Sequence, residues 1–245
     1  MEKLPRVFWA GDSTVAYNGA ATYPQAGLGQ GIRPFLREEI EIENHAVNGR
    51  STKSFLDEGR LKPIYDHLSE GDFLWIQFGH NDEKQEDPSR FTTPYGAYQE
   101  NLGQFILAAR DKKARPLLIT PLYRRRFRED GALDPSMHRE YRLAMMQTAR
   151  DLQVPCVDLC EASRSLLERT PPEESAHWFM NLEKGAFPNY PDGKQDNTHL
   201  QQQGAAVFGG LLAAGLRALG GVYRDLLADP DAPDDSFRGK IIAGK

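Results

Sequence analysis

This chain of 245 residues has few cysteines and lacks long apolar runs. No uninterrupted apolar stretch reaches the ~18 residues that a helix needs to cross a membrane, and no apolar stretch resembling a signal peptide precedes the first motif. The only two cysteines, Cys156 and Cys160, are too few for a disulfide framework. We interpret them as buried free thiols. These features predict a cytoplasmic protein without a membrane span.

An excess of basic residues is also missing. Lysine and arginine number 30 against 35 aspartates and glutamates, which gives a net charge of -5, so nucleic acid is not expected as a partner. Neither a His-Glu-x-x-His motif nor a Cys/His zinc spacing occurs, so we expect no metal or other cofactor. Because there is no Gly-x-Ser-x-Gly elbow, an ordinary α/β-hydrolase lipase is disfavoured. Residues 27–31 (Gly-Leu-Gly-Gln-Gly) lack the spacing of a nucleotide-binding fingerprint.

What the sequence does contain is an alternation of short apolar segments and helical patterns. Strands are predicted at 6–10, 40–47, 72–78, 117–120 and 154–159, and helices at 31–39, 94–113, 136–153 and 200–219. Strands separated by helices indicate a parallel sheet with helices on both faces. Residues 170–197 show no period and are predicted to form a long loop. We expect one domain over 1–228 and a loosely held C-terminal extension over 229–245.

Three residues that directly follow predicted strands are candidate functional groups, because open parallel sheets bind ligands beyond the carboxyl ends of their strands. Ser13 follows the first strand and can present its hydroxyl as a nucleophile, or simply cap the next segment. Gly49 follows the second strand, where its backbone can approach a ligand closely or serve an ordinary turn. Asn81 follows the third strand as a candidate oxyanion donor, with an Asx-turn as the alternative.

A fourth candidate is the pair Asp196 and His199, which precedes the last predicted helix. Residues three apart in a turn lie on the same side, so the carboxylate can orient one ring nitrogen of the histidine. The other nitrogen is then free to accept a proton from a serine. A helix cap and a surface histidine are the alternative. Together with Ser13, this pair supplies the parts of an acyl-transfer site at one edge of the sheet.

These motifs resemble the blocks of the SGNH hydrolases, the GDSL-type esterase superfamily, and occur in that family's order. The matching residues are 11–13 (Gly-Asp-Ser), Gly49, 79–82 (Gly-His-Asn-Asp) and 196–199 (Asp-Asn-Thr-His). More narrowly, segments 44–51, 77–82 and 189–199 are similar to those of the rhamnogalacturonan acetylesterases. The resemblance implies a three-layer α/β/α sandwich with a five-stranded parallel sheet, which is the flavodoxin-like SGNH hydrolase fold.

The resemblance also implies roles for individual residues. Ser13 would be the nucleophile, His199 the base and Asp196 its partner, and the N–H groups of Ser13 and Gly49 with the Asn81 amide would form the oxyanion hole. The implied activity is a serine esterase that removes acetyl groups from a carbohydrate, above all from rhamnogalacturonan oligosaccharides. Acetylated xylan oligosaccharides and short-chain acyl esters are alternative substrates, and a non-catalytic carbohydrate-binding protein is an alternative of another class.

The secreted fungal members of that family carry signal peptides and disulfides, and this chain shows neither, which favours an intracellular role on imported oligosaccharides. An acetylated oligosaccharide is therefore the expected partner, with neither nucleic acid nor a membrane.

Two further segments are candidates for substrate binding. Residues 123–128 (Tyr-Arg-Arg-Arg-Phe-Arg) follow the fourth predicted strand, and guanidinium groups pair well with carboxylates, so they could recognise galacturonate or form a solvated basic loop. Aromatic residues between 177 and 190 could form a platform for sugar rings or pack the loop onto the domain. The tentative substrate-binding set is Asp12, Arg50, His80, Arg124, Arg125, Trp178 and Tyr190.

Overall fold

A computed structural model of the chain describes residues 4–231 and 238–244. In this part of the chain a central sheet of six strands has the order β3-β1-β4-β5-β6-β8. Its first five strands are parallel to one another and the sixth is antiparallel. The strands are β1 (Val7–Gly11), β3 (Ile42–Asn44), β4 (Phe73–Gln77), β5 (Arg115–Ile119), β6 (Cys156–Val157) and β8 (Ile241–Ile242). The predicted five parallel strands are confirmed, and β8 adds an edge.

The central strands read as continuous apolar runs because both of their faces are covered. Every residue of β1 and β4 is buried, as is typical of parallel strands between two helical layers. Trp9 and Trp75 are direct neighbours in the sheet and pack edge to face with their rings 5.0 Å apart. Phe8 and Leu74 point to the opposite face and belong to a separate core cluster. The alternation divides the interior into two cores, one on each side of the sheet.

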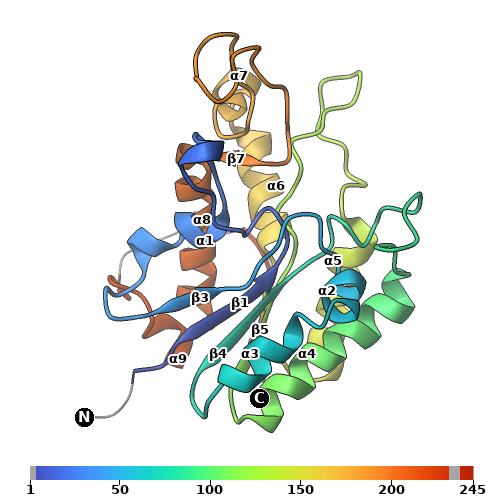
Figure 1. Cartoon of the computed structure of the whole chain (residues 1–245), viewed down its shortest axis with the longest axis vertical. Coiled ribbons are helices and arrows are strands. Elements are labelled where there is room, and N and C mark those ends of the chain that lie inside the picture. The colour runs from blue at the N-terminus through green and yellow to red at the C-terminus, as the bar shows by residue number, and fades with distance from the viewer. Residues whose placement is uncertain (1–3, 232–237, 245) are drawn as a thin grey trace.

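Helices cover both faces of the sheet, as Figure 1 shows, so the predicted three-layer α/β/α sandwich is confirmed. On the face of Trp9 lie α1 (Leu28–Gly31), α6 (Leu159–Arg169), α8 (Gln202–Leu219) and α9 (Gly221–Arg224). On the face of Phe8 lie α2 (Thr52–Asp57), α3 (Leu61–His67), α4 (Gln99–Asp111) and α5 (Arg139–Asp151). A short pair of antiparallel strands, β2 (Gln25–Ala26) and β7 (Leu200–Gln201), joins the segment before α1 to the segment before α8.

Gly31, the last glycine of residues 27–31, serves the packing of α1 against α8. A Cβ atom on Gly31 would lie 1.9 Å from the carbonyl oxygen of Ala205, and one on Gly209 would lie 2.2 Å from the carbonyl oxygen of Gly31. Such distances are far inside van der Waals contact, so the two helix backbones touch directly. The glycine-rich segment therefore has a structural use that requires no nucleotide.

Several predicted element boundaries were wrong. The helix predicted at 31–39 is only α1 followed by a 3-10 turn at Arg33–Phe35, because the ring of Pro34 in that turn supplies no backbone N–H to continue a helix. The strand predicted at 154–159 ends at Val157, and α6 begins at Leu159 because the Asp158 carboxylate accepts a hydrogen bond from Glu161 N and caps it.

The region predicted as a long loop, 170–197, contains a short helix, α7 (Pro172–Ala176).

The predicted C-terminal extension is not wholly loose, because Ile241 and Ile242 pair with β6. Its acidic, proline-containing stretch at 232–236 lies outside the described residues. The two cysteines are free and buried, as expected. Cys156 belongs to one core cluster and Cys160 to the other, so the sheet separates them. Within the described ranges, no helix is both long and apolar enough to cross a membrane.

Candidate active site

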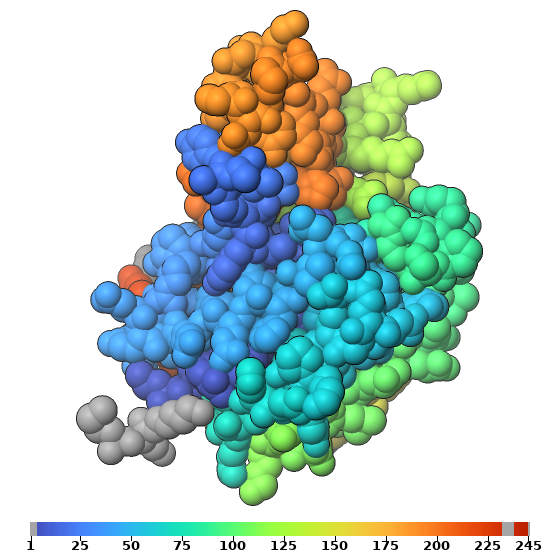
Figure 2. All heavy atoms as spheres, viewed as in Figure 1, coloured from blue at the N-terminus to red at the C-terminus, as the bar shows by residue number. Residues whose placement is uncertain are grey.

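The loops that follow β1, β3 and β4 meet at one edge of the sheet, as the sequence predicted. Val47 N donates to Gly11 O at 3.0 Å, so the loop after β3 runs alongside the loop after β1. The segment that precedes α8 returns to the same edge from the other end of the chain. Figure 2 shows this segment, in orange, standing directly above the blue residues near the N-terminus. The catalytic candidates therefore come from four separate parts of the sequence.

Ser13 sits in a tight turn that its neighbours hold in place. The Asp12 carboxylate accepts hydrogen bonds from the backbone N–H and the hydroxyl of Thr14 at 2.9 and 2.8 Å. Asn44 Nδ2 donates to Val15 O at 2.9 Å and ties the turn to β3. Asp12 is fully buried, and burial raises the pKa of its carboxyl group. The partly exposed side chain of Ser13 is thus fixed on a rigid support.

His199 connects Ser13 to Asp196 through a continuous row of hydrogen bonds. His199 Nε2 lies 2.9 Å from Ser13 Oγ, and His199 Nδ1 lies 2.7 Å from Asp196 Oδ2. The other carboxylate oxygen of Asp196 accepts the backbone N–H groups of Thr198 and His199 at 2.9 and 3.0 Å. These bonds fix the carboxylate in one rotation. The three predicted triad residues are therefore brought together.

The carboxylate of Asp196 is held in its charged form. Burial by itself would raise the pKa of this group, but the hydrogen bonds from the His199 ring and from the backbone outweigh it and lower the pKa well below its usual range. An ionised acceptor at Nδ1 keeps the proton of a neutral imidazole on that nitrogen, which leaves Nε2 as the acceptor for the serine hydroxyl. Lys194 Nζ, 3.2 Å from Asp196 Oδ2, also supports the charge. Sequence reasoning missed this lysine.

Two of the groups expected at the oxyanion hole come from the loops after β3 and β4. Gly49 has φ of +77°, a left-handed conformation that favours glycine. Within residues 4–231 and 238–244, neither the backbone N–H of Ser13 nor that of Gly49 has a backbone acceptor. Asn81 is 5% exposed, and its Nδ2 donates one hydrogen to Arg50 O at 3.0 Å, while its second hydrogen has no acceptor in the part of the chain that the structure describes. Arg90 Nη1 donates to Asn81 Oδ1 at 3.4 Å, which fixes the amide orientation.

Arg124 and Arg125, the predicted receptors for a substrate carboxylate, donate hydrogen bonds to acceptors of the protein itself, and as receptors they stay predictions. Arg124 donates to the ring Nδ1 and the carbonyl oxygen of His80 at 3.2 and 3.0 Å. Arg125 donates to Ser175 Oγ at 3.0 Å, to Asn197 Oδ1 at 2.9 Å and to the carbonyl oxygen of Pro172. Arg125 thereby holds the segment that carries Asp196 and His199.

Three of the tentative substrate contacts are wrong, because their side chains are buried. Trp178 is 5% exposed and packs edge to face on Phe208 at 5.8 Å, so it belongs to the core. Asp12 and His80 are 0% and 3% exposed, which leaves no surface for a sugar. Burial also lowers the pKa of His80 well below its usual value.

Tyr190 and Arg50 are both partly exposed at the edge that carries Ser13. The hydroxyl of Tyr190 donates to Thr22 O at 3.3 Å. As substrate contacts both residues stay predictions.

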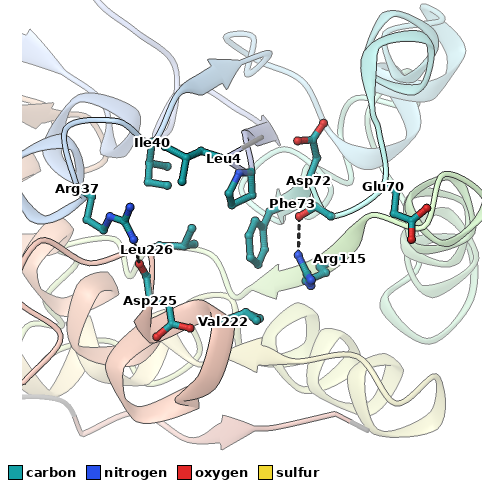
Figure 3. A pocket seen from close by; sticks show the side chains of 12 residues that line it. Leu4, Arg37, Ile40, Glu70, Asp72, Phe73, Arg115, Val222, Asp225 and Leu226 are labelled. Carbon is teal, nitrogen blue, oxygen red and sulfur yellow. Dashed lines mark hydrogen bonds between the residues drawn. The ribbon is translucent and has the colours of Figure 1, made fainter. Parts of the chain in front are cut away.

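A cavity of about 540 Å3 lies at the opposite edge of the sheet, where β4 and β5 begin. Figure 3 shows Phe73, Arg115, Val222 and Leu226 around it, with Arg115 donating to the carbonyl oxygen of Gly71. None of its lining residues belongs to the catalytic candidates. The candidate catalytic residues therefore lie at the carboxyl edge, away from this cavity.

Comparison with known proteins places this geometry in a family. Residues 10–207 match the model of the GDSL-like Lipase/Acylhydrolase family. The rhamnogalacturonan acetylesterase RhgT of Bacillus subtilis is 41% identical over 96% of this chain and 99% of its own length. The probable rhamnogalacturonan acetylesterase YesY of the same organism is 38% identical over 87% of this chain and 93% of its own.

A solved structure, that of the acetylxylan esterase Axe2 from Geobacillus stearothermophilus, has a TM-score of 0.58 at 16% identity. It covers 89% of this chain and 95% of that one. At this identity the likeness shows a shared fold.

Proposed function

Since the chain belongs to the GDSL-like lipase/acylhydrolase family and is a carboxylic ester hydrolase, we propose that it removes O-acetyl groups from rhamnogalacturonan oligosaccharides, with Ser13 as the nucleophile. The observation that carries the proposal is the row of hydrogen bonds from Ser13 Oγ through His199 to Asp196. The relatives named rhamnogalacturonan acetylesterase support the choice of substrate.

The proposed reaction has two acyl-transfer steps. Ser13 Oγ attacks the acetyl carbonyl carbon while His199 Nε2 takes the hydroxyl proton, and the carbonyl oxygen becomes an oxyanion. His199 then gives this proton to the sugar oxygen as the bond between that oxygen and the acetyl carbon breaks, so the sugar leaves as an alcohol and the acetyl group stays on Ser13 Oγ. Water enters, gives one proton to His199 and attacks the acetyl carbon. His199 returns this proton to Ser13 Oγ as acetate leaves.

The oxyanion in both steps would be held by the N–H groups of Ser13 and Gly49 and by the amide of Asn81. These donors lie on loops that hydrogen bonds fix before substrate arrives. Pre-oriented donors of this kind are typically worth about 3–4 kcal/mol of barrier each, or roughly 100- to 1000-fold in rate. A rigid arrangement is needed because donors that must reorient during the reaction lose much of this benefit.

A screen for acetate release tests the proposal. The purified protein is given acetylated rhamnogalacturonan oligosaccharides, acetylated xylan oligosaccharides and short-chain acyl esters at equal ester concentration. We expect the highest kcat/KM on the rhamnogalacturonan oligosaccharides. A higher value on xylan oligosaccharides or on the simple esters would contradict the substrate, while leaving an esterase. No acetate from any of them, with no reaction toward a serine-directed phosphonate, would favour a binding protein instead.

Two further parts of the proposal concern location and domain limits. We propose that the protein acts in the cytoplasm on imported oligosaccharides, which is compatible with the free, buried thiols of Cys156 and Cys160. Cell fractionation with an antibody tests this, and recovery in the culture medium would contradict it. We also propose residues 1–228 as the hydrolase domain and 229–245 as an extension that contributes β8 to the sheet.

A further inference from the structure

A second cavity, of about 220 Å3, borders the group expected to bind the oxyanion. Its walls are Gly49, Arg50, Ser54, Glu58, Ser89 and Arg90. Because Gly49 is both a wall of this cavity and a candidate oxyanion donor, the space adjoins the place where the ester carbonyl would sit. We call this space the Arg50–Arg90 cavity.

Arg90 reaches from this cavity to the active site. Its Nη1 lies 3.4 Å from Asn81 Oδ1 and 3.6 Å from the position that a Cβ on Gly49 would occupy. The Nε and Nη2 atoms of the same guanidinium are bound to Asp87, so the group is anchored on its far side. Its side chain is 28% exposed. The Nη1 end is therefore held near the oxyanion hole and remains partly open to solvent.

Arg50 lines the same cavity and is anchored in the same manner. Its Nε and Nη2 each lie 3.0 Å from a carboxylate oxygen of Glu58, and Nη1 donates to Asn48 O at 2.9 Å. A guanidinium has five N–H groups, so donors are left over on the terminal nitrogens. Two arginines that are already fixed by carboxylates lose little side-chain freedom when they bind a further anion.

We propose that the Arg50–Arg90 cavity binds the carboxylate of a uronic acid residue in the substrate, so that the enzyme selects acetyl esters carried by acidic sugars. This inference rests on the proposed function and assigns its specificity. It places this recognition at Arg50 and Arg90, which line the cavity beside Gly49, and not at Arg124 and Arg125, which do not line it. Guanidinium groups suit this task because they pair with a carboxylate through two parallel hydrogen bonds.

The test compares two substrates that differ only in charge. Acetylated rhamnogalacturonan oligosaccharides are used with their carboxyl groups free or converted to primary amides, and the ratio of kcat/KM for acid over amide is measured. Arg50→Gln and Arg90→Gln are compared with the unaltered protein. Arg164→Gln is the matched control, because Arg164 is similarly exposed, at 30%, and paired with carboxylates, but does not line this cavity.

A charge-assisted pair is worth roughly 10- to 100-fold in binding, so the unaltered protein should favour the acid by about that factor. Each cavity variant should bring the ratio toward one, and Arg164→Gln should keep it. Any general loss through the contact of Arg90 with Asn81 cancels in the ratio. The Arg50 side chain makes no such contact, because only its carbonyl oxygen binds Asn81.

The outcomes separate the inference from the proposed function. If the unaltered protein deacetylates the oligosaccharides but treats acid and amide alike, or if both cavity variants keep its ratio, the cavity assignment is wrong and the esterase function stands. If no acetate is released from the free-acid oligosaccharides, the proposed function itself fails. As an independent readout, deacetylated oligosaccharide should inhibit hydrolysis of 4-nitrophenyl acetate, with an inhibition constant about tenfold or more higher in Arg90→Gln.

Discussion

Replacing Asp196 with asparagine should disable the base while leaving the site in place. One carboxylate oxygen of Asp196 accepts two backbone N–H groups, from Thr198 and His199, and only the other faces the imidazole. An asparagine keeps the two backbone hydrogen bonds only if its amide oxygen occupies the place of the carboxylate oxygen that accepts them. Its NH2 group then faces His199 Nδ1. The ring must accept there, so its proton moves to Nε2, which faces Ser13.

The size of the effect follows from this tautomer. With a proton on Nε2, His199 can no longer accept the proton of Ser13, which lies 2.9 Å away. The same exchange in a serine protease triad lowers kcat by about 10^4-fold, equivalent to about 5.5 kcal/mol of barrier. We expect a loss of about 10^3- to 10^4-fold in Asp196→Asn, smaller than the ~10^6-fold typical when a nucleophile or base is removed.

The assay is steady-state hydrolysis of 4-nitrophenyl acetate, with thermal unfolding as a check that the variant is folded. The reasoning requires a fall in kcat with little change in KM, because the tautomer alters the chemical step. A folded Asp196→Asn protein with kcat within tenfold of the unaltered protein would refute the account of how Asp196 acts. Equal losses of kcat in Asp196→Asn and in a folded Lys194→Met variant would instead assign the effect to the ion pair between Lys194 and Asp196.

Three other predictions concern single contacts. Asn81→Ala should lower kcat on 4-nitrophenyl acetate by roughly 100- to 1000-fold, and less than a threefold change would exclude Asn81 from the oxyanion hole. Gly31→Ala should destabilise the fold by about 1–3 kcal/mol or more in urea unfolding, because its Cβ would strike Ala205 O. The control Gly103→Ala, with open space around it in α4, should not. Burial raises the pKa of Asp82 to about 7. Its contribution to stability is present at low pH and is lost as the pH rises through 7, so between pH 5 and 8 the melting temperature of Asp82→Asn should rise relative to that of the unaltered protein.

The arrangement of the sheet was predictable because its central strands are strongly apolar. Segments such as Val7–Gly11 and Phe73–Gln77 are buried on both faces, which leaves a signal that does not depend on the rest of the fold. The strand Ile241–Ile242 carries no such signal. It has only two residues, and its pairing with β6 depends on a partner more than 80 positions away in the sequence.

The convergence of the candidate catalytic residues was predictable for a different reason. Ser13, Gly49 and Asn81 each follow a strand, and topology alone brings the ends of parallel strands together. The pairing of Asp196 with His199 is local, three residues apart.

The side-chain partners of the tentative substrate contacts could not be predicted, because charge and aromatic character do not reveal them. Arg124 donates to His80, 44 positions away, and Trp178 packs on Phe208 across the core. Lys194 was missed because a lone lysine in a loop has no distinctive pattern.

The identity of the nucleophile is the central claim, and labelling tests it most directly. The protein is treated with a serine-directed phosphonate, and the modified peptide is identified by mass spectrometry alongside the kcat of Ser13→Ala on 4-nitrophenyl acetate. We predict one phosphonate per chain on the peptide that carries Ser13, none on Ser13→Ala, and nearly abolished hydrolysis by that variant. Modification at another residue, or wild-type kcat in Ser13→Ala, would contradict the account.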